Sequence, residues 1–246
     1  MSVNAIIQAR CGSTRFPNKV FATIDNKPLI YHVVDRLNYA SIIDDVIVAT
    51  TTNSEDDALE QWCSENRVKV FRGSEEYVLN RYYEASLCYP SEITVRITAD
   101  DPFKEPDVID KVVNKLIEEK LDLVTNNNPP SFPEGLDCEA FTFKTLQIME
   151  NEAHELFERE HVTQFAYHNP DKFRIGNVES DKNLSFLRWT IDTQEDYEMV
   201  NKIYESRSSG NTGILLMDEI LRILYQHPEI SKMNSQVKRS AMYQLT

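Results

Sequence analysis

The chain has 246 residues, of which 41% are hydrophobic and 27% charged, and its formal net charge is −14 at pH 7. Such an excess of negative charge argues against nucleic acid or an anionic membrane surface as a partner, and no apolar run approaches the about 20 residues that cross a bilayer. The start of the chain shows no charged-then-apolar leader, so we expect a cytoplasmic protein. From its length we expect one domain over residues 1–246.

Short β-rich runs alternate with amphipathic stretches over the first half of the chain. We expect strands at Val3–Ala9, Val46–Thr50, Val68–Arg72 and Ile93–Thr98, and helices at Leu29–Leu37, Ser54–Asn66, Glu75–Leu87 and Pro106–Lys120. This alternation is typical of α/β proteins, in which a mostly parallel sheet carries helices on both faces.

The second half is less regular. We expect strands at Asp122–Thr125, Glu139–Phe143, Phe173–Val178 and Phe186–Ile191, and helices at Phe157–Tyr167, Glu195–Ser206 and Leu216–Tyr225. The loop Asn126–Asp137 is too long to be a mere connector, and loops of this length often form the wall of a binding site.

A Gly-Ser loop with three cations follows the first predicted strand. Gly12 and Ser13 allow backbone N–H groups to turn toward an anion, while Arg10, Arg15 and Lys19 supply positive charge. The spacing matches neither the Walker loop nor the three-glycine dinucleotide fingerprint. The pattern therefore predicts a phosphate-binding loop of another kind, although a solvated turn with surface cations is the alternative for such a loop taken alone.

Two aspartates follow predicted strands, Asp100 after Ile93–Thr98 and Asp192 after Phe186–Ile191. Because the carboxyl ends of strands line the ligand crevice of an open α/β sheet, these side chains are expected to meet there. Two carboxylates together with substrate phosphates are suitable ligands for Mg²⁺. An isolated aspartate at such a position more often caps a turn or a helix, so the interpretation depends on the phosphate loop beside it.

These motifs and three more resemble the nucleotidyltransferases of the sugar and acylneuraminate cytidylyltransferase superfamily, and within it the spore-coat polysaccharide biosynthesis branch. Besides the opening loop, the resemblance rests on Thr98–Phe103, Glu134–Glu139, Arg159–Thr163 and Arg188–Thr193, and it covers nearly the whole chain. The family usually has glycine in the loop where this chain has Asn18. Asparagine tolerates a positive φ better than most residues, so we expect the turn to be kept.

The resemblance implies a Rossmann-like sheet of the nucleotide-diphospho-sugar transferase (GT-A-like) type, with a nucleotide-binding half at 1–125 and an acceptor-binding half at 126–246. It implies transfer of CMP from CTP to a sugar or other glycan precursor with release of pyrophosphate, Mg²⁺ as cofactor on Asp100 and Asp192, and a possible homodimer. Arg15 and Lys19 are the implied catalytic residues. The implied triphosphate site comprises Ala9, Arg10, Gly12, Ser13, Arg15, Lys19, Thr98, Ala99 and Asp100, and the implied acceptor site comprises Glu134, Asp137, Glu139, Arg159 and His161.

Other functions remain open at the level of sequence. A GTP-dependent guanylyltransferase acting on a sugar 1-phosphate would use the same motifs, because none of them identifies the base. A glycosyltransferase that consumes a nucleotide sugar would be expected to show Asp-X-Asp, whereas this chain has adjacent Asp100 and Asp101. The acceptor is equally open between a nine-carbon acidic sugar, a hexose 1-phosphate and a non-sugar phosphate.

Overall fold

A seven-stranded sheet with the order β5-β4-β1-β6-β8-β7-β9 forms the centre of the computed structural model, which describes residues 1–13, 15–207 and 213–238. Neighbouring strands are parallel except around β8, which runs antiparallel to both β6 and β7. The strands are β1 (Val3–Gln8), β4 (Asp45–Thr51), β5 (Lys69–Gly73), β6 (Ile93–Thr98), β7 (Leu123–Thr125), β8 (Glu139–Thr142) and β9 (Ile175–Asn177). The predicted α/β fold with a mostly parallel sheet is confirmed.

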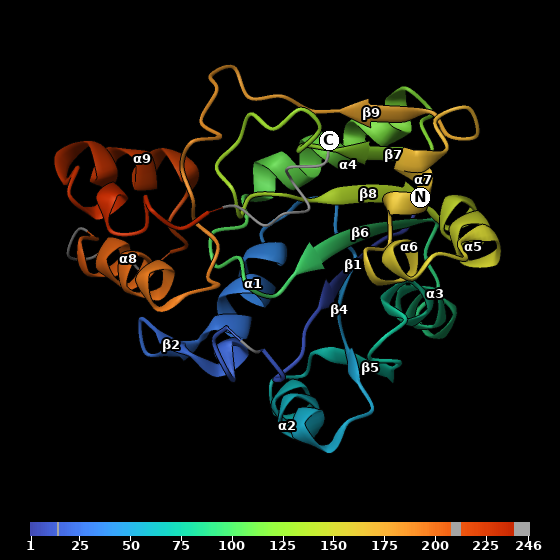
Figure 1. Ribbon diagram of the computed structural model, residues 1–246, viewed down its shortest axis with the longest axis horizontal. Coiled ribbons are helices and arrows are strands. Elements are labelled where there is room, and N and C mark those ends of the chain that lie inside the picture. Colours follow the sequence, from blue (N-terminus) through green and yellow to red (C-terminus); the bar gives the residue numbers. More distant parts are fainter. Residues whose placement is uncertain (14, 208–212, 239–246) are drawn as a thin grey trace.

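Helices cover both faces of the sheet. Successive side chains of a strand point to opposite faces, and both sets are buried. Ala5 and Ile7 of β1 contact the cluster that includes α1 (Leu29–Leu37), α2 (Asp57–Glu65), α4 (Pro106–Glu118), α8 (Gln194–Glu205) and α9 (Met217–Gln226). Ile6 faces the other cluster, with α3 (Val78–Cys88), α5 (Phe143–Glu152) and α7 (Gln164–His168), and α6 (Leu156–Glu160) lies against α3. Figure 1 shows α8 and α9 on one side of the molecule and α3, α5 and α6 on the other.

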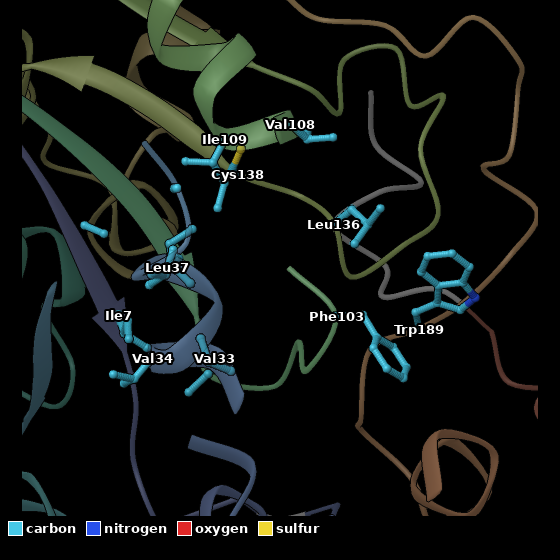
Figure 2. Packing of buried hydrophobic residues seen from close by; sticks show 14 of the residues in the cluster. Ile7, Val33, Val34, Leu37, Phe103, Val108, Ile109, Leu136, Cys138 and Trp189 are labelled. Carbon is cyan, nitrogen blue, oxygen red and sulfur yellow. The ribbon is translucent and has the colours of Figure 1, made fainter. Parts of the chain in front are cut away.

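The first of these faces holds the larger core. Val33, Val34 and Leu37 of α1 pack toward Ile7, and the ring of Phe103 stands edge-on to that of Trp189 with 6.0 Å between the centroids (Figure 2). Shorter elements complete the chain: a separate hairpin of β2 (Thr23–Ile24) and β3 (Lys27–Pro28), and the 3-10 helices η1 (Lys19–Phe21), η2 (Ser54–Asp56) and η3 (Ile230–Lys232).

The strand predicted at Phe186–Ile191 is wrong. This segment joins the loop 126–137 through one isolated bridge between Glu134 and Arg188 and belongs to no strand of the sheet. Its apolar residues do not indicate a strand: Trp189 and Ile191 are buried in the core outside the sheet, and Phe186 is 78% exposed. The backbone N–H of Ile191 donates to the carbonyl of Asp100 at 2.9 Å, so the segment still reaches the end of β6.

The helix predicted at Phe157–Tyr167 is two short helices, α6 and α7. Val162 lies between them with a φ of 58°, which interrupts the helical hydrogen bonds. The structure also adds α5, which begins directly after β8 where the Thr142 hydroxyl accepts a hydrogen bond from the N–H of Thr145 at 3.1 Å.

Among the described residues, none of the helices has the length and apolar character needed to cross a membrane.

Candidate active site

A cleft of about 900 Å³ lies over the ends of the strands, a volume typical of ligand sites. Residues from both halves of the chain line it. The sequence-predicted residues among them are Ala9, Arg10, Ser13, Arg15, Lys19, Thr98, Ala99, Asp100, Glu134, Asp137, Glu139, His161 and Asp192. Gly12 instead packs against Glu55, and Arg159 lies over the ring of Tyr77 with 5.5 Å between guanidinium and centroid, so neither belongs to the lining.

A hydrogen bond to the Asp56 carboxylate fixes the loop after β1. The backbone N–H of Cys11 donates to Asp56 Oδ1 at 2.7 Å, and the carbonyl of Cys11 accepts from the N–H of Asn18 at 3.1 Å. Asn18 has a φ of 55°, the left-handed conformation expected for the position where the family usually has glycine. Thr14 of the predicted loop lies outside the described residues.

Lys19 bridges the two predicted metal ligands. Its ammonium Nζ lies 2.9 Å from Asp100 Oδ2, 2.9 Å from Asp192 Oδ1 and 3.0 Å from the carbonyl oxygen of Ile191. Burial by itself raises the pKa of the Asp100 carboxyl, but the charge and hydrogen bond of Lys19 outweigh it and lower that pKa to about 2. Both carboxylates are therefore gathered around one cation at neutral pH.

Asp192 is held in place by two further cations. Arg15 Nη2 lies 3.0 Å from Asp192 Oδ1, and Arg188 Nη2 lies 3.1 Å from Asp192 Oδ2. The buried Arg188 also binds both oxygens of Asp196 at 2.9 Å and Oε1 of Glu134 at 2.7 Å. Arg188 thus links Asp192 to the start of α8 and to the loop 126–137.

Asp101 does not point to the same cation as its neighbour Asp100. It pairs with the fully buried Lys104 at 2.8 Å and accepts a hydrogen bond from the Thr98 hydroxyl at 2.7 Å. Burial raises the pKa of Asp101 to about 6, because Lys104 only partly offsets the loss of water. Lys104 also donates to the carbonyl of Asp137, so this pair fixes the loop 126–137 to the end of β6.

The predicted acceptor residues have protein partners of their own. Glu134 pairs with Arg188, and Glu139 accepts hydrogen bonds from Arg96 at 2.7 Å, from the Tyr167 hydroxyl at 2.7 Å and from the Thr163 hydroxyl at 2.9 Å. Burial lowers the pKa of His161, whose ring packs against Phe157. The carboxylate of Glu139 consequently orients Arg96 and Tyr167 at this end of the cleft.

Gly135 allows the loop 126–137 to approach the Arg188–Thr193 segment. Its φ is 105°, and a Cβ there would lie 2.8 Å from the backbone nitrogen of Thr190. A larger residue would strain the backbone and push the loop away from the segment that carries Asp192.

The donor set fits a hard divalent cation only in part. Within the described residues, no group of three or more His, Cys, Asp or Glu side chains could hold a metal. Asp100 and Asp192 could provide two carboxylate oxygens, and Mg²⁺ is commonly bound by one or two carboxylates with phosphates and water as the other ligands. The residues present are therefore compatible with a cation that arrives together with a phosphorylated substrate.

Comparison with known proteins identifies the family. The family model described as cytidylyltransferase matches residues 4–230. The chain belongs to the cytidylyltransferase family. This membership makes the protein a nucleotidyltransferase. It does not establish which acceptor the protein uses.

Individual relatives agree with this assignment. The chain is 30% identical over 231 residues to the spore coat polysaccharide biosynthesis protein SpsF of Bacillus subtilis. The alignment covers 91% of this chain and 94% of SpsF. The chain superposes on a cytidylyltransferase structure from Leptospira borgpetersenii with a TM-score of 0.88 and 29% identity, covering 98% and 99% of the two chains. A CMP:2-keto-3-deoxy-manno-octonic acid synthetase complexed with CTP shares the fold, with a TM-score of 0.65, 18% identity and coverage of 83% and 99%.

Three arginines of this cytidylyltransferase family member were not singled out individually from the sequence. Arg188 is the first residue of the Arg188–Thr193 motif, but its partners lie 4, 8 and 54 residues away along the chain, and no local pattern predicts them. Arg96 interrupts the apolar run of β6, and Arg81 stands beside the buried Tyr82 in α3. A charged residue inside an apolar run was the available signal for Arg96, whereas Arg81, which follows Asn80, had none.

Proposed function

We propose that the protein transfers CMP from CTP to a sugar or similar glycan precursor and releases pyrophosphate, in the biosynthesis of a surface polysaccharide. The observation that carries the proposal is the cluster in which Lys19 joins Asp100 and Asp192 beside Arg15, in the lining of the cleft of a cytidylyltransferase family member. Cations and carboxylates in contact at one point suit a substrate that brings both phosphates and a metal.

Two comparisons support the choice of nucleotide and pathway. The fold is shared with a synthetase whose structure was determined in complex with CTP, and the relative SpsF is named for spore coat polysaccharide biosynthesis. Carried over to this chain, these names favour CTP over GTP and a glycan precursor over an unrelated acceptor.

The proposed reaction is an in-line displacement at the α-phosphorus of CTP. An acceptor oxygen forms a bond to that phosphorus while the bond to the oxygen bridging the α- and β-phosphates breaks, so pyrophosphate leaves with the electron pair. Arg15 and Lys19 offset the negative charge that develops on the phosphate oxygens. Mg²⁺, held by Asp100 and Asp192, would supply additional charge neutralisation when it is bound.

Thermal unfolding with CTP, GTP, UTP or ATP, each with and without Mg²⁺, tests the proposal without knowledge of the acceptor. A ligand at 100 times its Kd stabilises by about 2.7 kcal/mol, which corresponds to several degrees in a chain of this size. We expect a shift in Tm with CTP and Mg²⁺. A shift with GTP alone would favour a guanylyltransferase, and no shift with any triphosphate would contradict the proposal.

Lys19→Met tests the assigned chemistry. Because an electrostatic partner of the developing charge is removed, turnover should fall by about 10²–10³-fold, measured as pyrophosphate release from CTP with an acceptor found by screening acidic sugars and sugar phosphates on the wild type. Lys111→Met, which removes an exposed lysine of α4, is the matched control and should leave turnover unchanged. Wild-type turnover in the Lys19 variant would show that this residue does not act on the reacting phosphate.

A further inference from the structure

Tyr197 of α8 contacts the chain on both sides of Lys19. Its ring lies against the ring of Phe16 with 5.5 Å between the centroids and 57° between the planes, a tilted arrangement that is favourable for an aromatic pair. Its hydroxyl donates to the carbonyl of Thr23 at 2.7 Å. The 3-10 helix η1, which begins at Lys19, lies between these two attachment points along the chain. At the level of elements, β2, which begins at Thr23, lies beside α8 (Figure 1).

The residue before Tyr197 holds the opposite side of the charge cluster. Asp196 is fully buried, and its Oδ2 accepts hydrogen bonds from the backbone N–H groups of Asp192 at 3.0 Å and Thr193 at 3.1 Å. Asp196 and Tyr197 are neighbours near the start of α8, where a capping box fixes the first turn. Consecutive residues of one helix thus hold the carboxylate segment and the cation loop, so α8 sets the distance between them.

This attachment becomes important when a nucleotide binds. Arg15 and Lys19 contact Asp192 at 3.0 Å and 2.9 Å, and they must exchange at least part of these contacts for the phosphates of CTP. The side chain of Arg15 is 58% exposed, so burial does little to fix its position. The contacts of Tyr197 involve neither charged group and can persist while the cations change partners.

We propose that Tyr197 is a positioning residue of the nucleotide site, which keeps Arg15 and Lys19 within reach of the triphosphate as they leave Asp192. This inference rests on the proposed function. Tyr197 lies outside the lining of the cleft, so it acts through the loop and not by contact with the nucleotide. Its removal should weaken CTP binding although every side chain that lines the cleft is retained.

Isothermal titration of the full chain with CTP and Mg²⁺, without an acceptor, measures this role. Tyr197→Leu removes both contacts and should raise the Kd for CTP by about tenfold, because ordering of the loop must then be supplied by nucleotide binding. Tyr197→Phe keeps the ring and loses only the bond to Thr23, so its Kd should lie between those of the wild type and Tyr197→Leu.

Tyr89→Leu is the matched control. Tyr89 is also partly buried, and its hydroxyl also donates to a backbone carbonyl, that of Val70 at 3.1 Å. Its ring packs against the cluster on the α3 side and lies outside the lining of the cleft. Tyr89→Leu should lower Tm, as Tyr197→Leu should, but keep the wild-type Kd for CTP. The pair separates positioning from a general loss of stability.

A double-mutant cycle with Arg15→Met tests the route of the effect. If Tyr197 acts by holding the cations of the loop, Tyr197→Leu should raise the Kd by a smaller factor in the Arg15→Met background than in the wild type. One of the cations that it positions is already absent there. Independent effects would instead multiply.

Three results would overturn the inference. A wild-type Kd in Tyr197→Leu, or an equal increase in Tyr197→Leu and Tyr89→Leu, would leave Tyr197 with a role in stability alone. Multiplying effects in the cycle would show that Tyr197 does not act through the cations. The absence of CTP binding in the wild type would contradict the proposed function, and that result is distinct from wild-type binding that Tyr197→Leu leaves unchanged.

Discussion

Lys19 lies between two carboxylates, and its ammonium group forms a hydrogen-bonded ion pair with each of them. Its contacts to Asp100 and Asp192 are equal at 2.9 Å, and Arg15 shares Asp192 with it. For these two cations to reach a triphosphate, their contacts with the aspartates must weaken. A divalent cation that binds the aspartates would release them, so metal and nucleotide should favour each other's binding.

This coupling predicts an unusual effect of Asp192→Asn. Removing the carboxylate charge frees Lys19 and Arg15 for the triphosphate and removes a repulsion from it. The Kd for CTP without Mg²⁺ should therefore fall by about tenfold, equivalent to about 1.4 kcal/mol, while the gain on adding Mg²⁺ shrinks. Isothermal titration calorimetry in EDTA and in Mg²⁺ measures both values, and weaker metal-free binding by the variant would contradict the prediction.

The pKa of Asp100 predicts how stability depends on pH. The carboxyl has a pKa of about 2 in the folded protein against an ordinary value of 3.8, so its ionised form stabilises the fold above about pH 4 and this contribution is lost as the pH falls to about 2. The difference in free energy of unfolding between wild type and Asp100→Asn should shrink over that range. Urea unfolding at a series of pH values measures it, and a constant difference would argue against the Lys19 pairing.

At the scale of elements, hydrophobic alternation predicts the first half of the fold well. The helix at Leu29–Leu37 and the strand at Ile93–Thr98 have the predicted bounds, because apolar residues recur with the helical period in the first and alternate with polar residues in the second. The Phe186–Ile191 segment shows the limit of the method. Its apolar residues are buried against other elements and not in a sheet, and sequence alone does not distinguish these cases.

Asn18 offers a test of the phosphate loop as an element. A β-branched residue in the left-handed conformation costs on the order of 1–2 kcal/mol, so Asn18→Val should destabilise the loop by about this amount and weaken CTP binding. Asn18→Gly should stay close to the wild type in both respects. Urea unfolding and CTP titration compare the three proteins, and equal behaviour of the valine and glycine variants would mean that the turn is not needed.

At the scale of the whole molecule, the site is joined by ion pairs between distant segments. Glu134, Arg188, Asp192 and Asp196 lie on a loop, an extended segment and the start of α8, and Arg188 contacts the other three. Most of the motif residues lie in the lining of the cleft, but the motifs do not indicate which of them pair with one another. Pairing depends on where segments separated by up to 54 residues meet, and this is set by tertiary packing.

Arg188→Met should therefore lower the stability of the entire chain. It leaves buried carboxylates at Glu134 and Asp196 without their counterion, a change that typically costs about 3–5 kcal/mol. The control Arg174→Met removes an exposed pair with Asp122 and should cost about 1 kcal/mol or less. Urea unfolding compares the two, and a similar loss in both would mean that the Arg188 network is no more than a surface arrangement.

The reversed direction of β8 has a consequence for how this scaffold can be altered. Thr125 at the end of β7 pairs with Glu139 at the start of β8, so both ends of the intervening loop are fixed to one rung of the sheet. Because the two ends of this loop are fixed to each other, part of its length and composition can change while the distance between its ends stays the same. Acceptor preference should thus be exchangeable between homologues by grafting residues 126–133, because Glu134 and Gly135, which hold the segment that carries Asp192, then stay in place.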